Sequence, residues 1–191
     1  QLINECTGMY WLWKNATDDY IGLVHYRRYF LKEAAEGGID NILDEGSVKE
    51  IMKDYDIITC PMYDFGISVR QQLKATIMEE AYEKSEQLIT ESICKYQPEY
   101  LDLFYHVMSG RCMYPCNMFM TRKKLFDEYC EWLFSIIIEP AEKIDVSGYD
   151  SYSKRVIGFF AERLFTVWLL NQPLRIKEAP LFITEILVQQ R

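Results

Sequence analysis

Short apolar runs alternate along this chain with longer stretches of helical periodicity. The runs are 20–26, 55–60 and 117–120; the first two are rich in β-branched and aromatic residues, and Pro61 ends the second. Runs of this length and composition predict strands that are buried in a sheet. Strands that alternate with helices predict an α/β domain, so we expect a mostly parallel or mixed central sheet that is flanked by helices.

Helical periodicity covers most of the remaining chain, because apolar residues recur every three or four positions. The expected helices are 5–15, one in the acidic stretch 33–56, two within 68–108 that divide near Pro98, 123–138 (ended near Pro140) and 154–170. The last helix is apolar around most of its circumference, which predicts burial on several sides. An edge strand is expected at 175–179.

The size and composition predict one compact domain with a large core. Of the 191 residues, 49% are hydrophobic and 26% are charged. The net charge of -8 excludes a domain-wide electrostatic surface for nucleic acid or for an anionic membrane. Any bound anion therefore needs a local basic cluster. No apolar run reaches the roughly 20 residues that span a bilayer, so no transmembrane segment is expected.

The six cysteines follow no spacing that a disulfide framework would need. They are Cys6, Cys60, Cys94, Cys112, Cys116 and Cys130. We expect them to be reduced core residues of a cytosolic protein. The close pair Cys112 and Cys116, with His106 nearby, lacks the second Cys or His pair of a tetrahedral zinc site, so burial is favoured over a metal role.

Two adjacent arginines, Arg27 and Arg28, follow directly after the first apolar run. Ligands of open α/β sheets bind outside the carboxyl ends of the strands, and two guanidinium groups there could hold a diphosphate with bidentate hydrogen bonds. The alternative is that one arginine is solvated and the other pairs with Asp18 or Asp56. His25 is either part of this site or a half-buried histidine with a structural hydrogen bond.

Glu162 is a carboxylate on a helix that otherwise has the composition of a core helix. Burying a carboxylate is costly unless the group is paired or functional, and a carboxylate in such a place could act as a general base. Arg155 lies seven residues earlier, nearly two turns away, and therefore shares its face. The alternative to catalysis is an ion pair of Glu162 with Arg155 or Arg163.

Five segments of the chain form an ordered set of motifs. They are Asn4 to Asn15, Tyr20 to Phe30, Asn117 to Phe119, Tyr129 to Phe134 and Gly158 to Leu164. In this order they resemble the family called domain of unknown function 4422 (DUF4422), and the block His25-Tyr26-Arg27-Arg28-Tyr29 is the most specific part. The resemblance covers nearly the whole chain.

The resemblance implies a glycosyltransferase of the GT-A kind, with a single domain over 1–191 and a nucleotide-diphosphate sugar as donor at the carboxyl ends of its strands. The family is associated with bacterial capsular and O-antigen polysaccharide synthesis, and galactofuranosyl transfer is one reaction linked to it. The implied acceptor is a growing surface polysaccharide or a lipid-linked glycan. The implied location is the cytoplasm, including peripheral association with the inner face of the membrane.

Two departures from the family pattern affect these expectations. Family members carry a further segment before Asn4, so we expect this chain to be truncated at its amino terminus. Residues 62–95 match least, because many members have a tyrosine and a histidine where this chain has Gln71, Gln72 and Leu73. The alternative function is therefore a non-catalytic module, derived from a glycosyltransferase, that binds a glycan or a partner.

Enzymes of the implied kind hold a divalent metal on the diphosphate with an Asp-x-Asp after a central strand. Here Arg27 and Arg28 follow that strand, so we expect them to replace the metal and no cofactor to be needed; Mn²⁺ or Mg²⁺ held by Asp18 and Asp19 is the alternative. The implied catalytic residues are Glu162 (the base), Arg27 and Arg28. The implied substrate-binding residues are His25, Tyr26, Tyr29, Trp11, Asn117 and Arg155.

Overall fold

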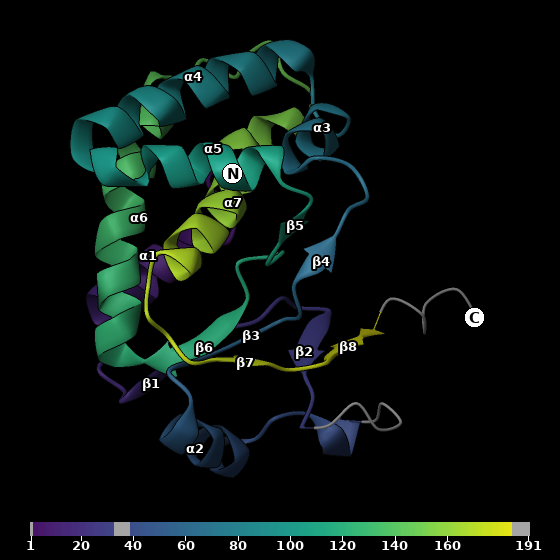
Figure 1. The fold of residues 1–191 in the computed structure, drawn as a ribbon, viewed down its shortest axis with the longest axis vertical. Coiled ribbons are helices and arrows are strands. Elements are labelled where there is room, and N and C mark those ends of the chain that lie inside the picture. Colours follow the sequence, from purple (N-terminus) through teal and green to yellow (C-terminus); the bar gives the residue numbers. More distant parts are fainter. Residues whose placement is uncertain (1, 33–38, 185–191) are drawn as a thin grey trace.

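The computed structural model describes residues 2–32 and 39–184, and its main sheet has four strands (Figure 1). In the order of the sheet, they are β1 (Tyr20–Leu23), β6 (Phe119–Arg122), β3 (Ile57–Thr59) and β7 (Ile176–Glu178). Strand β6 is antiparallel to both of its neighbours, whereas β3 and β7 are parallel. This confirms the predicted α/β class with a mixed sheet; a mostly parallel sheet is not what forms.

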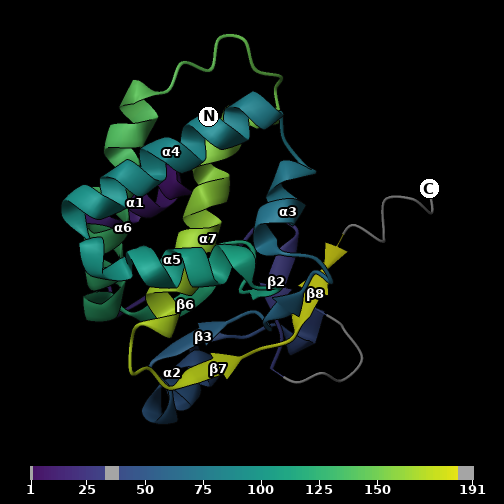
Figure 2. The ribbon, with the colours of Figure 1, turned by 45° about the horizontal axis from the view of Figure 1, so that its top comes forward.

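Helices cover both faces of this sheet. Figures 1 and 2 show α2 (Glu45–Asp54) on one side and the larger helical layer on the other. That layer contains α1 (Cys6–Asn15), α3 (Val69–Lys74), α4 (Glu79–Tyr96), α5 (Leu101–Ser109), α6 (Lys123–Lys143) and α7 (Val156–Leu170). Successive side chains of a strand point to opposite faces, so Ile57 belongs to the core of the large layer whereas Ile58 packs with Met52 of α2.

Short elements complete the described fold. Strand β2 (Arg28–Phe30) pairs antiparallel with β8 (Leu181–Ile183), and β4 (Tyr63–Asp64) pairs antiparallel with β5 (Cys112–Met113). Single 3-10 turns occupy Ile39–Asn41, Pro98–Tyr100 and Ser153–Arg155. The last turn leads directly into α7.

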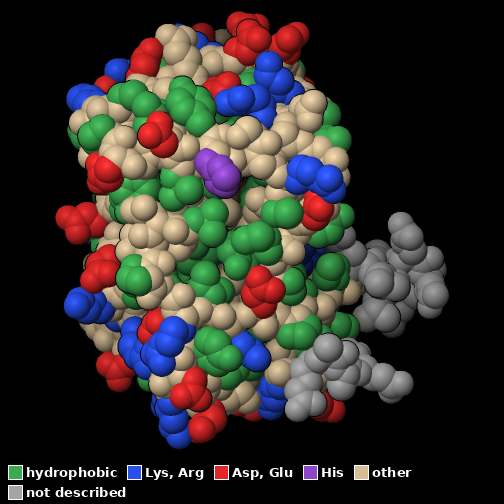
Figure 3. All heavy atoms as spheres, in the orientation of Figure 1, with side chains coloured by type: hydrophobic (Ala, Val, Ile, Leu, Met, Phe, Trp, Pro, Cys, Tyr) green, Lys and Arg blue, Asp and Glu red, His purple; other side chains and the backbone are tan. Residues whose placement is uncertain are grey.

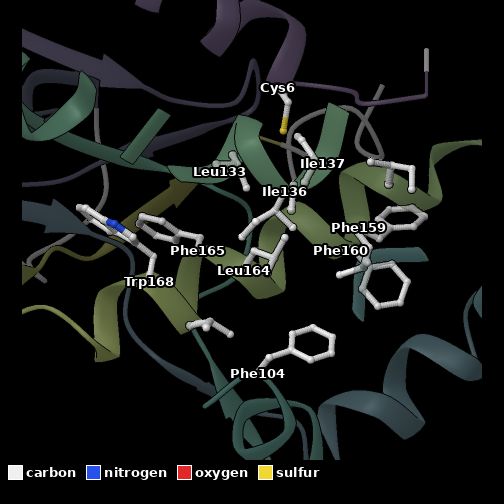
Figure 4. Packing of buried hydrophobic residues seen from close by; sticks show 14 of the residues in the cluster. Cys6, Phe104, Leu133, Ile136, Ile137, Phe159, Phe160, Leu164, Phe165 and Trp168 are labelled. Carbon is white, nitrogen blue, oxygen red and sulfur yellow. The ribbon is translucent and has the colours of Figure 1, made fainter. Parts of the chain in front are cut away.

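Helix α7 lies within the larger hydrophobic core, which confirms the buried helix predicted over 154–170 (Figure 4). Thirteen of its 15 residues are buried. Its side chains Phe160 and Leu164 share that core with Phe104 of α5 and Ile136 of α6. Apart from Leu170 at its end, Glu162 is the one residue of α7 that is not buried, so this carboxylate must face a less crowded space.

Helix α6 continues through Pro140, where the sequence predicted an end. A proline inside a helix has no N–H for the carbonyl group four residues earlier, which is that of Ile136. Ser92 of α4 supplies the missing donor, because its Oγ donates to the Ile136 carbonyl oxygen at 2.7 Å. The carbonyl group of Ile136 is therefore hydrogen-bonded in spite of the buried Pro140, and α6 continues to Lys143.

The predicted strand 20–26 is shorter and less buried than expected. Strand β1 ends at Leu23 and has a single buried residue, Ile21, because it is an edge strand of the sheet. The chain then leaves the sheet and reverses, with an isolated antiparallel bridge between His25 and Arg28.

Other predictions have mixed outcomes. The helix at 5–15, the buried strand at 55–60, the break near Pro98 and the edge strand before Pro180 are confirmed. The region 68–108 contains three helices rather than two, because the chain also turns at 75–78, where the Met78 N–H donates to Ser153 Oγ. Part of the acidic stretch, 33–38, lies outside the described residues.

The cysteines and the surface also differ in part from expectation. All six cysteines are free, but Cys94 and Cys112 are exposed, so the prediction that they belong to the core was wrong for these two. Acidic and basic side chains are interspersed over the face that Figure 3 shows. Within the described ranges, no helix is long and apolar enough to cross a membrane.

Candidate active site

A cavity of about 280 Å³ brings together segments that are far apart in the sequence. The turn after β1 contributes His25 and Arg28, α3 contributes Gln72, and the loop before β6 contributes Cys116. The remaining wall is formed by the start of α7 and the 3-10 turn before it, with Arg155, Phe159, Glu162 and Arg163. The cavity thus joins four residues that the sequence nominated separately: His25, Arg28, Arg155 and Glu162.

One face of α7 presents charged groups to this cavity. Arg155, Phe159 and Glu162 are four and three residues apart, so they follow one another along the helix. The Glu162 side chain is 18% exposed and accepts a long hydrogen bond of 3.4 Å from Arg163 Nη1. Arg155 does not form the predicted pair with Glu162: its Nε donates to Asn4 Oδ1 at 2.9 Å, and its guanidinium stacks on Phe159.

Arg163 is the most deeply buried charge of the cavity, with only 4% of the residue exposed. Its Nη1 donates to the Phe159 carbonyl oxygen at 2.9 Å and its Nη2 donates to Gln72 Oε1 at 2.6 Å. Its Nε is buried without a hydrogen-bond partner. Burial lowers the pKa of Arg163 from its usual value, with a smaller opposing effect of Glu162. The guanidinium of Arg163 thus keeps one donor that no protein group uses.

Cys116 holds the other two basic side chains of the cavity in place. Its carbonyl oxygen can only accept, so His25 Nε2 donates to it at 2.6 Å, and Arg28 Nη1 donates to Cys116 Sγ at 2.6 Å. Burial raises the pKa of the Cys116 thiol to about 11, so this group stays protonated at neutral pH. The sulfur therefore leaves the charge of Arg28 available for a ligand.

The backbone around the cavity contains an unusual concentration of left-handed conformations. Three non-glycine residues of the described ranges have positive φ: Asn4 (46°), Cys116 (76°) and Asn117 (48°). Asn4 binds Arg155, Cys116 binds His25 and Arg28, and Asn117 accepts from the Tyr129 hydroxyl at 3.0 Å. Strained residues of this kind gather at functional sites, where the surrounding structure holds them.

Glu5 is a second carboxyl group beside the cavity, and the sequence analysis assigned it no role. It stands at the start of α1, with Oε1 buried and without a hydrogen-bond partner. Burial, together with the nearby charge of Glu162, raises the pKa of Glu5 to about 7. The one sequence signal for a role of Glu5 was its place in the Asn4-Glu5-Cys6 motif. The periodicity of the sequence does not indicate that this motif packs against α7.

Comparison with protein families matches residues 1–173 to the domain of unknown function DUF4422. The chain belongs to the DUF4422 family. This confirms the resemblance drawn from the sequence motifs. No curated protein matches the chain.

Among solved structures, the DUF4422 chain is similar to the apo structure of the bifunctional glycosyltransferase WbbM. The TM-score is 0.77 and the sequence identity is 25%. The match covers 96% of this chain but 37% of WbbM. The chain therefore has the fold of one part of this glycosyltransferase.

The structure separates the two adjacent arginines of the family motif. Because His25 and Arg28 form a bridge, Tyr26 and Arg27 are the two residues of the turn between them. Arg28 lines the cavity, whereas Arg27 lies outside its lining and stacks on Tyr26 at 4.7 Å. The expectation that both arginines face one cleft is therefore corrected.

The aromatic candidates also lie outside this cavity. Tyr26 is 77% exposed, Trp11 is 62% exposed on α1, and the Tyr29 hydroxyl donates to the Tyr26 carbonyl oxygen. Asn117 is fully buried. It accepts a hydrogen bond from the Tyr129 hydroxyl and lowers the pKa of Glu5. These four residues, which the resemblance implied to bind substrate, are therefore not part of the lining of this cavity.

Asp18 and Asp19 belong to a different hollow, of about 510 Å³, which β1 and the start of α2 line. Asp44 and Glu45 also line it, but they already pair with Lys32 and Lys49. Across the described part of the chain, no group of three or more His, Cys, Asp and Glu side chains is arranged to hold a metal ion.

Proposed function

We propose that this DUF4422 domain is a glycosyltransferase that moves a sugar from a nucleotide-diphosphate sugar to a hydroxyl group of a glycan or lipid-linked acceptor. The carrying observation is that the guanidinium groups of Arg28, Arg155 and Arg163 line the same cavity as the partly exposed carboxylate of Glu162. A donor of this class carries a diphosphate and the reaction needs a base, and this cavity offers a group for each. The similarity to WbbM supports the same class of reaction.

The three arginines would bind the donor through its diphosphate. A guanidinium fork matches two phosphate oxygens, and each such charged hydrogen bond is stronger than a neutral one. Asn4 and Cys116 each fix one nitrogen of Arg155 and Arg28, and the Phe159 carbonyl oxygen and Gln72 fix both terminal nitrogens of Arg163. The remaining donors are preorganised, so they can stabilise the charge that develops on the departing diphosphate without rearranging.

Glu162 would act as the base. Its carboxylate takes the proton of the acceptor hydroxyl, the acceptor oxygen bonds to the anomeric carbon of the sugar, and the bond from that carbon to the diphosphate oxygen breaks. The electron pair of the broken bond leaves with the diphosphate, next to the arginines. His25, on the opposite wall, would contact the donor beside Arg28.

A divalent metal does not fit this donor set. Mg²⁺ and Mn²⁺ prefer several oxygen ligands, but the cavity is lined by three arginines and one carboxylate. We therefore propose that transfer is metal-independent, although the GT-A kind of fold that we assign to the domain commonly uses a metal. Activity should survive excess chelator; loss of activity that added Mn²⁺ restores would contradict this part of the proposal.

The finer assignments follow from the family. We propose that the acceptor is a bacterial capsular or O-antigen polysaccharide, that galactofuranosyl transfer is the reaction to test first, and that the domain works in the cytoplasm, at the inner face of the membrane. The exposed Tyr26 and Arg27, next to the cavity residues His25 and Arg28 in the chain, are then candidates for contacts with a longer acceptor.

The experiment is a calorimetric titration of uridine diphosphate sugars onto the natural chain that carries this domain, followed by a transfer assay. Arg155→Ala should weaken binding, whereas Arg111→Ala should not, because Arg111 pairs with Asp64 outside the cavity. Binding without transfer to any glycan acceptor would favour the non-catalytic binding module. Absence of binding would overturn the proposal.

A further inference from the structure

We propose that Glu5 is a positioning residue for the site: its buried carboxyl group, held near the face of α7 that carries Glu162, stays neutral and so adds no second negative charge beside the cavity. This inference rests on the proposed function, in which Glu162 is the base. Nothing in the family resemblance assigns a role to Glu5. The argument begins with how the amino-terminal turn is fixed against α7.

Close packing of Asn4 on Gly158 holds this turn in place. The Gly158 N–H donates to the Leu2 carbonyl oxygen at 3.3 Å, and Asn4 Oδ1 accepts from Arg155 Nε at 2.9 Å. A Cβ atom at Gly158 would lie 2.4 Å from Asn4 Nδ2, so the approach depends on glycine. Because Glu5 follows Asn4 directly, its side chain is held near the face of α7 that carries Glu162.

The groups around Glu5 come from each of the elements packed against it. Glu162 on α7 and Arg155 before α7 are its charged neighbours, and the amide of Asn117 has a smaller effect that lowers the pKa of Glu5. The thiol of Cys6 also faces it, but burial holds the pKa of Cys6 well above its usual value. Burial likewise raises the pKa of Tyr129 well above its usual value. Glu5 is therefore the group in this cluster that loses its proton near neutral pH.

The geometry explains why Glu5 keeps its proton. Glu162 has an ion-pair partner, Arg163, and borders the cavity. Glu5 has a buried oxygen without a partner and is not part of the cavity lining. A carboxyl group that is poorly solvated and unpaired favours its neutral form, and a negative charge nearby adds to this effect. With its pKa raised to about 7, Glu5 fits that description.

A protonated Glu5 affects the proposed reaction through the charge near the cavity. It leaves this region with one negative charge fewer, so the anionic donor meets less repulsion. When the pH rises above about 7 and Glu5 ionises, the repulsion returns and donor binding should weaken.

The first test needs no activity. A carboxyl group whose pKa is raised on folding binds its proton more tightly in the folded state, so its contribution to stability is complete below its ordinary pKa of 4.5 and is lost as the pH rises through about 7. Glu5→Gln cannot ionise. Its melting temperature, relative to the wild type, should therefore increase between pH 5 and pH 8, by roughly 5 °C.

Two control variants make this test specific. Glu131→Gln changes an exposed glutamate of α6 and should give a melting difference that does not depend on pH. In a Glu162→Gln background the pH-dependent gain from Glu5→Gln should be smaller, because the neighbouring charge is gone. A melting difference for Glu5→Gln that is constant from pH 5 to pH 8 would overturn the inference.

The second test is the pH profile of sugar transfer. In the wild type, kcat/KM for the donor should fall about tenfold per pH unit above pH 7 through a rise in KM, and this fall should be absent in Glu5→Gln. At pH 6 the two proteins should differ by less than about twofold. A parallel fall in both proteins would overturn the inference. If no transfer is found at all, the proposed function fails, while the melting experiment still decides the state of Glu5.

Discussion

Arg155 Nε donates a hydrogen bond to Asn4 Oδ1 across 151 positions of the sequence. This contact joins the amino-terminal turn of the chain to the helix that carries Glu162. It also orients the guanidinium of Arg155 between that turn and the ring of Phe159. This part of the site thus combines a segment near residue 4 with a segment near residue 155. The position of the Arg155 guanidinium depends on the close packing between these two segments.

Gly158→Ala tests this dependence. The added methyl group would overlap with Asn4 Nδ2, and Asn4 already has a constrained, left-handed backbone. We expect a loss of about 1–3 kcal/mol in the free energy of unfolding, measured with urea, together with weaker donor binding because Arg155 loses its support. Gly148→Ala is the control: a Cβ there meets nothing within 4 Å, so the change should stay within about 0.5 kcal/mol.

Ser92 and Ser85 offer a matched pair on α4. Ser92 Oγ satisfies the carbonyl group that Pro140 leaves without a donor, whereas Ser85 Oγ is buried without a partner. Ser92→Ala should therefore cost about 1–3 kcal/mol in the free energy of unfolding, and Ser85→Ala should be neutral or stabilising. Equal losses in urea denaturation would show that the Ser92 bond does not support the proline.

Much of the fold could be predicted because its signals are local. The strand 55–60 and the buried helix 154–170 follow from composition and periodicity over a few residues. The pairing of strands could not be predicted, because the antiparallel partner of β3 is β6, some 60 residues further on, and its parallel partner is β7. The same holds for α6, whose passage through Pro140 depends on a serine from another helix.

The candidate site was predicted only in part, for a related reason. His25, Arg28, Arg155 and Glu162 are polar side chains next to or within apolar segments, so the sequence could nominate them. The difference between Arg27 and Arg28 depends on a two-residue turn, which composition does not reveal. Glu5 and Arg163 are distinguished by their burial, which distant segments of the chain cause. No local sequence pattern predicts that burial.

The two arginines of the turn give a direct test of the cavity. Arg28→Ala should weaken the binding of a nucleotide-diphosphate sugar by about 1.5–3 kcal/mol, which is the scale of a hydrogen bond to a charged group. Arg27→Ala should change the affinity by less than about 0.5 kcal/mol, since Arg27 lies outside the cavity lining. Calorimetry on both variants measures the difference. Equal losses would place the donor on the surface of the turn rather than in the cavity.

Glu162→Gln separates catalysis from structure. If Glu162 is the base, the variant should fold normally, keep the donor affinity and lose on the order of 10²–10⁴ in rate, which is the usual contribution of acid–base catalysis. If Glu162 only pairs with Arg163, the same change should lower the melting temperature and leave the rate of the folded protein largely intact, because a buried guanidinium has lost its carboxylate. The 3.4 Å separation and the side chain's partial exposure make this pair a weak one, so we expect the first outcome. Single-turnover transfer at saturating donor, with melting curves of the same samples, distinguishes the two.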